Sequence, residues 1–181
     1  LTVEAEAAGA ALRYRAGQYP EVSSPALARG EDPGSLQEPD PEDDGRMPEV
    51  LRGVRILRES AGDDIVVVGC VSGPMTMVMQ LMGAEAALYA AIDEPEWFAA
   101  VLEYATNVAA RFAGAQIRAG AHVCMVFAPS SSPDVIPPAF FREFVVPGLS
   151  RVFAASKEAG AMLTWLHIAG PVDPILQYYP S

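Results

Sequence analysis

The sequence predicts a parallel α/β fold and, more specifically, an incomplete segment of a (β/α)8 barrel. Three short apolar runs, at residues 63–74, 122–129 and 161–170, are bounded by turn residues, as strands buried on both faces of a sheet are. Segments of helical periodicity separate these runs, and no hairpin signal joins them. An open doubly wound sheet is the alternative. No G-x-G-x-x-G or G-x-x-x-x-G-K motif follows any of the strands, which favours the barrel.

The first 48 residues are the least regular part of the chain. Residues 1–18 open with a short helical pattern, and "ALRYRA" after Gly9 is a possible fourth strand. Residues 19–48 are rich in Pro, Gly, Asp and Glu, and such a composition buries little apolar surface. We therefore expect an extended surface loop there. The acidic stretch "DPEDDGR" lacks the spacing of an EF-hand, so we interpret it as solvated rather than metal-binding.

Helices are expected between the strands. Asp93 is a good N-cap for the longest of them, and Gly62 and Gly120 are placed to end two of them. Pro147 should kink or divide the helix that precedes the third strand. The predicted helices cover residues 48–62, 75–83, 93–120 and the latter part of 132–160, and another begins within 171–180.

The formal net charge of −11 argues against two classes of partner. Only 12 Lys and Arg residues are spread along the chain, whereas a nucleic-acid binder carries a basic patch, and an anionic membrane surface repels an acidic protein. No apolar run reaches the roughly 20 residues that span a bilayer. Cys70 and Cys124 do not make a disulfide framework, so a reducing cytoplasm is the expected location.

Both ends of the chain look cut. The start, "LTVEAEAAGA", has neither an initiator methionine nor the basic region of a signal peptide, and "ILQYYPS" stops without a capping signal. At most four strands are present, whereas a barrel of about 250 residues needs eight. We therefore expect residues 1–181 to be one partial barrel domain that lacks the first strand and the last strands. Half a barrel exposes strand edges and its apolar interior, so we expect it to pair with another copy or to pack within a longer chain.

Function should lie where the carboxyl ends of the parallel strands meet. The loops that follow the three strands are residues 70–77, 127–134 and 167–173, and they carry hydroxyl and apolar side chains but few charges. Such a mouth suits a moderately large, partly apolar organic ligand. The candidate substrate-binding residues are Met75, Gln80, Phe127 and Ser130.

His167 is the ionisable side chain nearest the end of the third strand. We interpret it as a catalytic residue or a metal ligand, with a structural, hydrogen-bonded histidine as the alternative. Cys70 lies near the same rim, but a buried structural cysteine is the simpler interpretation. His122 and Cys124 form an H-x-C pair at the amino end of the second strand, the side that usually serves stability in barrels.

Four stretches, in order "LTVEAEAAGA", "VSGPMTMVMQLMG", "IRAGAHVCMVFAP" and "LTWLHIAGPVDPIL", together resemble the uroporphyrinogen decarboxylase superfamily. They are most similar to its methylcobamide:coenzyme M methyltransferase branch, which includes the methyltransferase halves of corrinoid enzymes. The resemblance covers nearly the whole chain. It implies a TIM barrel, of which the opening strand and the last few strands would be missing here.

The two branches of the superfamily differ at positions that can be compared directly. Its decarboxylases have a tyrosine in the helix after the G-P-x-T turn, where this chain has Gln80, and Phe-Asp-Ser after the next strand, where it has Phe127, Ala128 and Pro129. Their catalytic aspartate and a key arginine would precede residue 1. The glutamine resembles the methyltransferase pattern. The resemblance therefore implies a corrinoid-dependent methyltransferase, which moves a methyl group between a small donor or thiol and a cobamide and works with a corrinoid protein.

The methyltransferase branch binds zinc through a His-x-Cys pair and a later cysteine, and the zinc activates the substrate thiol. His167 matches the first ligand, Ala169 stands at the second, and the third would fall beyond Ser181. The resemblance thus implies zinc, but only one ligand position is matched within the chain. Two other functions stay open: a uroporphyrinogen decarboxylase of tetrapyrrole biosynthesis, and a non-catalytic barrel that binds a tetrapyrrole or corrinoid.

Overall fold

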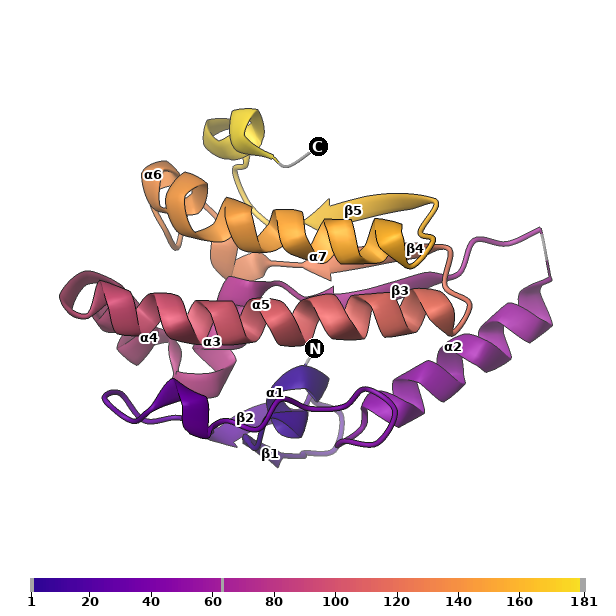
Figure 1. The fold of residues 1–181 in the computed structure, drawn as a ribbon, viewed down its shortest axis with the longest axis horizontal. Coiled ribbons are helices and arrows are strands. Elements are labelled where there is room, and N and C mark those ends of the chain that lie inside the picture. The colour runs from indigo at the N-terminus through magenta and orange to yellow at the C-terminus, as the bar shows by residue number, and fades with distance from the viewer. Residues whose placement is uncertain (1, 63, 180–181) are drawn as a thin grey trace.

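The computed structural model describes residues 2–62 and 64–179, and its centre is a three-stranded parallel sheet (Figure 1). Helices α5 (Pro95–Arg118) and α7 (Val146–Glu158) pack against each other and cover one face of that sheet. The strands, in their order across the sheet, are β3 (Val68–Ser72), β4 (Val123–Phe127) and β5 (Leu163–His167). The three apolar runs of the sequence therefore form neighbouring parallel strands, as predicted.

The hydrophobic core lies between the sheet and these helices. Val71 of β3 and Val126 of β4 have no exposed surface, and Phe112 of α5 is buried with them. Phe98, in the first turn of α5, is also fully buried and packs at an angle against Phe140. Because each fully buried side chain of this size stabilises a fold by about 1.5–3 kcal/mol, this layer accounts for much of the driving force for folding.

The helices on either side of β3 follow the prediction in part. Helix α2 (Met47–Ala61) ends at Gly62, and α3 (Pro74–Met82) follows β3, both as expected. A further helix, α4 (Ala84–Asp93), was not predicted. It starts after Gly83, whose φ of +87° turns the chain sharply between two helices.

The prediction that Asp93 caps the long helix is wrong. Asp93 is the last residue of α4, and Glu94 stands at the N-cap of α5 without a side-chain cap hydrogen bond. Pro95 at the first position of α5 has no N–H, so the start of this helix has one fewer backbone N–H group without a partner inside the helix. The Asp93 carboxylate instead accepts a 2.9 Å hydrogen bond from the guanidinium of Arg29.

No single helix of residues 2–62 and 64–179 is long and apolar enough to cross a bilayer. Helices α3 and α4 reach the required length and composition only when taken together, and they meet at a bend of 107°.

Pro147 changes the helix before β5 in the way that its chemistry predicts. The helical segment starts with α6 (Pro138–Phe140), passes through a π-helical stretch at Phe141–Val145 and continues as α7. Because proline has no N–H, Pro147 cannot donate a hydrogen bond to the carbonyl four residues before it. The N–H of Val146 donates to the carbonyl of Phe141, five residues back, which is the π-helical spacing. Pro147 thus falls in the first turn of a new α-helix rather than at a kink within one.

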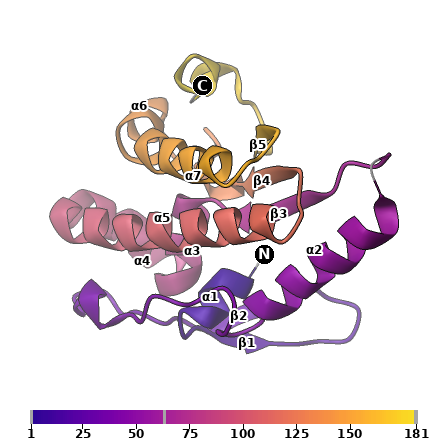
Figure 2. The same ribbon diagram turned by 45° about the vertical axis from the view of Figure 1, so that its right-hand side comes forward.

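The interpretation of "ALRYRA" as a strand of the barrel, with no hairpin in the chain, is wrong. Ala11–Arg13 form β1, which pairs antiparallel with β2 (Glu21–Ser24) in a separate two-stranded sheet. Both strands are largely exposed, whereas a strand of a parallel barrel is buried on both faces. Figure 2 shows this hairpin beside helix α1 (Val3–Ala7), on the far side of α5 from α7.

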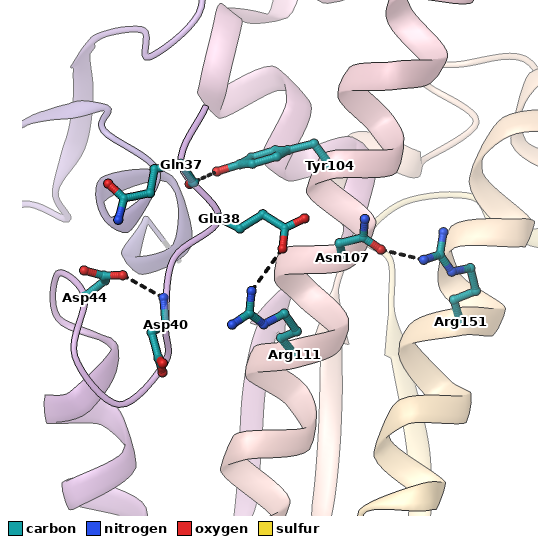
Figure 3. Close-up of polar contacts among 8 residues, drawn as sticks. All are labelled: Gln37, Glu38, Asp40, Asp44, Tyr104, Asn107, Arg111 and Arg151. Carbon is teal, nitrogen blue, oxygen red and sulfur yellow. Dashed lines mark hydrogen bonds and ion pairs between the residues drawn. The ribbon is translucent and has the colours of Figure 1, made fainter. Parts of the chain in front are cut away.

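The expected surface loop, residues 19–48, is largely exposed, but it contains the strand β2 and buries Leu27 in the core. The acidic part of the loop is fixed to α5 at several points (Figure 3). The Tyr104 hydroxyl donates a 2.7 Å hydrogen bond to the Gln37 carbonyl, and Arg111 forms a 3.0 Å ion pair with Glu38. Within the loop, the Asp44 carboxylate accepts a 2.7 Å hydrogen bond from the Asp40 N–H. The acidic side chains therefore serve as local anchors. A short 3-10 helix, Pro33–Ser35, interrupts the loop.

β5 departs from the expectation of a strand buried on both faces. Leu163 is 54% exposed and Trp165 is 46% exposed, and both lie on the face of the sheet that α5 and α7 leave open. The helix that was expected to begin within residues 171–180 is a 3-10 helix, Asp173–Tyr178. The open face is therefore an apolar surface next to a strand that has no second neighbour among the described residues.

We expect the isolated 181-residue chain to self-associate through this surface, because an exposed strand edge and exposed apolar side chains both favour pairing. Sedimentation velocity over a range of concentrations should show a species larger than the monomer. Trp165→Lys, which places a charge on the open face, should shift the distribution toward monomer, and Tyr19→Lys, on an exposed residue between β1 and β2, should not. A monodisperse wild-type monomer would contradict the prediction.

Candidate functional site

The carboxyl ends of the three strands place Ser72, Phe127 and His167 side by side. The parallel register pairs Ser72 with Phe127, and Phe127 with His167. The ladder continues past the strands, because the Gly73 N–H bonds to the Phe127 carbonyl at 2.8 Å and the Ala128 N–H bonds to the His167 carbonyl at 2.9 Å. The rim that the sequence predicted is thus a regular, hydrogen-bonded edge.

His167 lies at this rim with its imidazole stacked on the ring of Phe127. The ring centroids are 5.0 Å apart and the planes differ by 18°. Within residues 2–62 and 64–179, neither ring nitrogen of His167 forms a hydrogen bond, and the side chain is half-buried. The nitrogens are therefore open to a ligand, to a proton or to further chain.

The four candidate substrate-binding residues differ in their accessibility. Phe127 and Gln80 are half-buried, and Ser130 follows β4 with its N–H 3.4 Å from the hydroxyl of Thr76. Met75 has no exposed surface and packs in the hydrophobic core. The structure therefore brings Phe127 to His167 and keeps Met75 away from the surface of the rim.

Two polar residues that the sequence analysis did not propose lie beside β3. The Gln116 side chain of α5 makes a two-point contact with the main chain of Cys70, since its Oε1 accepts from the Cys70 N–H and its Nε2 donates to the Cys70 carbonyl, both at 2.9 Å. Glu4 of α1 is 2% exposed, and its carboxylate accepts a 2.6 Å hydrogen bond from the Ser72 N–H. On the edge of β3 that does not face β4, these two side chains take the hydrogen-bonding positions that the main chain of a neighbouring strand would otherwise take.

Gly69 makes the Gln116 contact possible. A Cβ at position 69 would lie 2.7 Å from the Gln116 Oε1, which is closer than such atoms pack. Glu4, Ala5 and Ala8 share one face of the opening helix and all three are buried, but the sequence did not mark Glu4 as a partner of β3. A pocket of about 420 Å³ lies next to these residues and is lined by the free edge of β3 together with α1, α2 and α5.

The two cysteines are free thiols in environments that disfavour the thiolate. Burial raises the pKa of Cys70 to about 11, and the nearby Glu4 carboxylate contributes to the rise. Burial raises the pKa of Cys124 to about 12. Among the described residues, His122 and Cys124 are not joined by a further metal-ligating side chain, and the Nδ1 of His122 accepts a 2.9 Å hydrogen bond from the Val67 N–H.

Alkylation tests these thiols. A thiol with a pKa near 11 holds only about one thiolate in a thousand molecules at pH 8, so we expect iodoacetamide to modify folded Cys70 at least about 100-fold more slowly than an unperturbed cysteine. The rate should rise about tenfold per pH unit up to the pKa. Mass spectrometry can follow both cysteines, with the chain unfolded in urea as the reference. Modification of Cys70 at the same rate in both states would contradict the prediction.

The described residues do not supply the ligand set of a thiolate zinc site. No group of three or more His, Cys, Asp or Glu side chains gathers closely enough to hold a metal ion in this part of the chain. Ala169 has no donor atom, and the Cys70 thiol stays protonated at neutral pH. Of the three ligand positions, His167 alone is present.

Comparisons with known proteins agree on one family. A family model described as uroporphyrinogen decarboxylase (URO-D) matches residues 1–180. A methylcobamide:CoM methyltransferase, MtaA, of Methanosarcina barkeri is 32% identical over 177 residues, which are 97% of this chain and 51% of that protein. A uroporphyrinogen decarboxylase of Geobacillus thermodenitrificans is 29% identical over 87% of this chain and 46% of that protein.

The fold is shared with a solved structure, a methyltransferase from Methanosarcina mazei. It superposes with a TM-score of 0.88 at 30% identity, and the match covers 97% of this chain and 51% of the other. The chain thus spans about half the length of the curated relatives it matches.

Proposed function

The chain belongs to the uroporphyrinogen decarboxylase family, and from this premise we propose that it is half of a corrinoid-dependent methyltransferase. The enzyme would move a methyl group between a small donor or thiol and a cobamide, which a corrinoid protein presents at the barrel mouth. The observation that carries the proposal is the similarity to methylcobamide:CoM methyltransferases over 97% of this chain. We also propose that residues 1–181 form one partial barrel domain, completed by strands outside this chain.

The composition of the rim supports methyl transfer over decarboxylation of a porphyrinogen. Residues 70–77, 127–134 and 167–173 contain no Lys or Arg. A substrate with several carboxylates would need cations there to offset the loss of its hydration. A methyl group on a thiol or a cobalt ion makes no such demand, and the apolar ring of Phe127 beside His167 suits it.

His167 is the residue that we assign to the chemistry. With a thiol as acceptor, its neutral imidazole would take the S–H proton, and the resulting thiolate would attack the methyl carbon. The S–C bond forms, the Co–C bond breaks, and its electron pair stays on cobalt, while His167 holds the proton until solvent takes it. The open nitrogens of His167 support this role, and no step here depends on zinc.

A direct assay tests the proposal. The full protein, incubated with methylcobamide and a small thiol, should convert the absorption spectrum of the methylated cobamide to that of the demethylated form and yield a methyl thioether. Uroporphyrinogen in place of these substrates should be left unchanged. Loss of carboxyl groups from uroporphyrinogen without methyl transfer would instead identify a decarboxylase, the alternative that the similarity to the Geobacillus enzyme favours. Binding of a corrinoid without either reaction would identify a non-catalytic barrel.

A further inference from the structure

The side chain of His167 is held in place from one side by the ring of Phe127. The rings are nearly parallel, with centroids 5.0 Å apart and an interplanar angle of 18°. The ring nitrogens lie in the plane of the imidazole, so they point past the Phe127 ring rather than into it. The stack therefore restricts the orientation of the imidazole and leaves its two nitrogens accessible.

The main chain beneath both rings is fixed as well. The Ala128 N–H donates a 2.9 Å hydrogen bond to the His167 carbonyl, which locks β5 to the residue that follows Phe127. Ala128 is fully buried, and Gly73 approaches it so closely that a Cβ at position 73 would lie 2.7 Å from the Ala128 Cβ. Because the backbone is held on both sides, the His167 imidazole can change its orientation only by rotation about its side-chain bonds. The Phe127 ring limits this rotation.

We propose that Phe127 is a positioning residue, which orients the His167 imidazole toward the barrel mouth. This inference deepens the proposed function and rests on it for the identity of the reaction, though not for the orientation itself. It gives Phe127 a role different from substrate contact. A positioning role predicts loss of rate at unchanged substrate affinity, whereas a contact to substrate predicts weaker binding.

The test replaces Phe127 in the full protein with Leu and with Met, which remove the ring, and with Trp, which keeps a flat ring. The first readout is the 13C–1H spectrum of 13C-labelled histidine, with the His167 signals assigned by their loss in His167→Ala. In the wild type, the ring current of Phe127 should shift these signals, and the shift should vanish in Phe127→Leu and Phe127→Met. The matched control is Phe140→Leu, which removes another stacked ring, paired with Phe144, far from His167 in the chain.

The second readout is methyl-transfer kinetics. We expect kcat to fall by about 10- to 100-fold in Phe127→Leu with the KM of the thiol changed less than about twofold, and Phe127→Trp to restore most of it. Unchanged histidine signals in both ringless variants would overturn the proposal, as would a rise in KM at unchanged kcat. If the wild type transfers no methyl group, the proposed function fails, and the spectra alone still decide whether Phe127 orients His167.

Discussion

Replacing His167 with alanine is expected to lower the rate of methyl transfer by the full protein by about 10²–10⁴-fold, the usual loss when a general base is removed. The physical reason is that the imidazole is the ionisable group at the mouth whose nitrogens are open, while the Cys70 thiol has a pKa of about 11 and is protonated at neutral pH. Single-turnover measurement of cobamide demethylation checks the effect, because it isolates chemistry from product release.

His122→Gln provides the matched control, since His122 lies at the opposite end of β4 and its Nδ1 bonds to the Val67 N–H. We expect this variant to retain activity within about threefold if it folds, because it does not touch the rim. Elemental analysis of the wild type and of His167→Ala separates a proton acceptor from a metal ligand. If the wild type contains zinc and His167→Ala does not, His167 is a metal ligand, and a metal-assisted step takes the place of general-base catalysis. A fully active His167→Ala enzyme would show that His167 does not take part in the chemistry.

Gln116→Leu is expected to destabilise the fold by about 2–4 kcal/mol. Leucine keeps much of the volume but leaves both the N–H and the carbonyl of Cys70 without the partner that Gln116 provides at 2.9 Å. Gln116 itself is 1% exposed, but the pocket beside β3 reaches Gln116 and Cys70, so water can replace part of the lost contact and the expected effect lies toward the lower end of this range. Denaturant unfolding followed by circular dichroism checks the free energy of unfolding.

The matched control is Gln37→Leu in the acidic loop. Figure 3 shows that the Gln37 side chain points away from Tyr104, which bonds to its carbonyl, so the hydrogen bond survives the substitution. An exposed change of this kind should shift the free energy of unfolding by no more than about 0.5 kcal/mol. Equal effects of the two leucine variants would mean that the Gln116 contact with β3 does not contribute to stability.

The central sheet was predictable because its signal is local. Continuous apolar runs between turn residues mark strands, and three such runs became β3, β4 and β5, although β5 is exposed on one face. The first strand misled the prediction because its partner is not visible in its own sequence. "ALRYRA" pairs antiparallel with Glu21–Ser24, and this pairing, which places it outside the parallel sheet, is a non-local fact. The cap at Asp93 failed because the unpredicted helix α4 extends through Asp93, whose carboxylate bonds to the distant Arg29.

The candidate site was predictable to the level of the rim and no further. Parallel strands bring their carboxyl ends together, so the neighbourhood of Phe127 and His167 follows from topology, but the stacking of their rings depends on side-chain torsions that no pattern encodes. The contacts of Glu4 and Gln116 with β3 join residues 68 and 46 positions apart. Such contacts leave no periodic trace in the sequence.

The contacts of Glu4 and Gln116 also bear on the order in which the sheet is assembled. Both residues precede β4, so a nascent chain that has emerged only through α5 already contains every group needed to shield the Cys70 and Ser72 amides. One side of β3 is then occupied before its partner strand is synthesised, and the other side alone is free to receive it. Among the strands of this chain, β4 would therefore add to the free side of β3 and β5 would add to β4, whereas a strand from outside this chain that pairs with the other side of β3 would have to displace the Glu4 and Gln116 side chains.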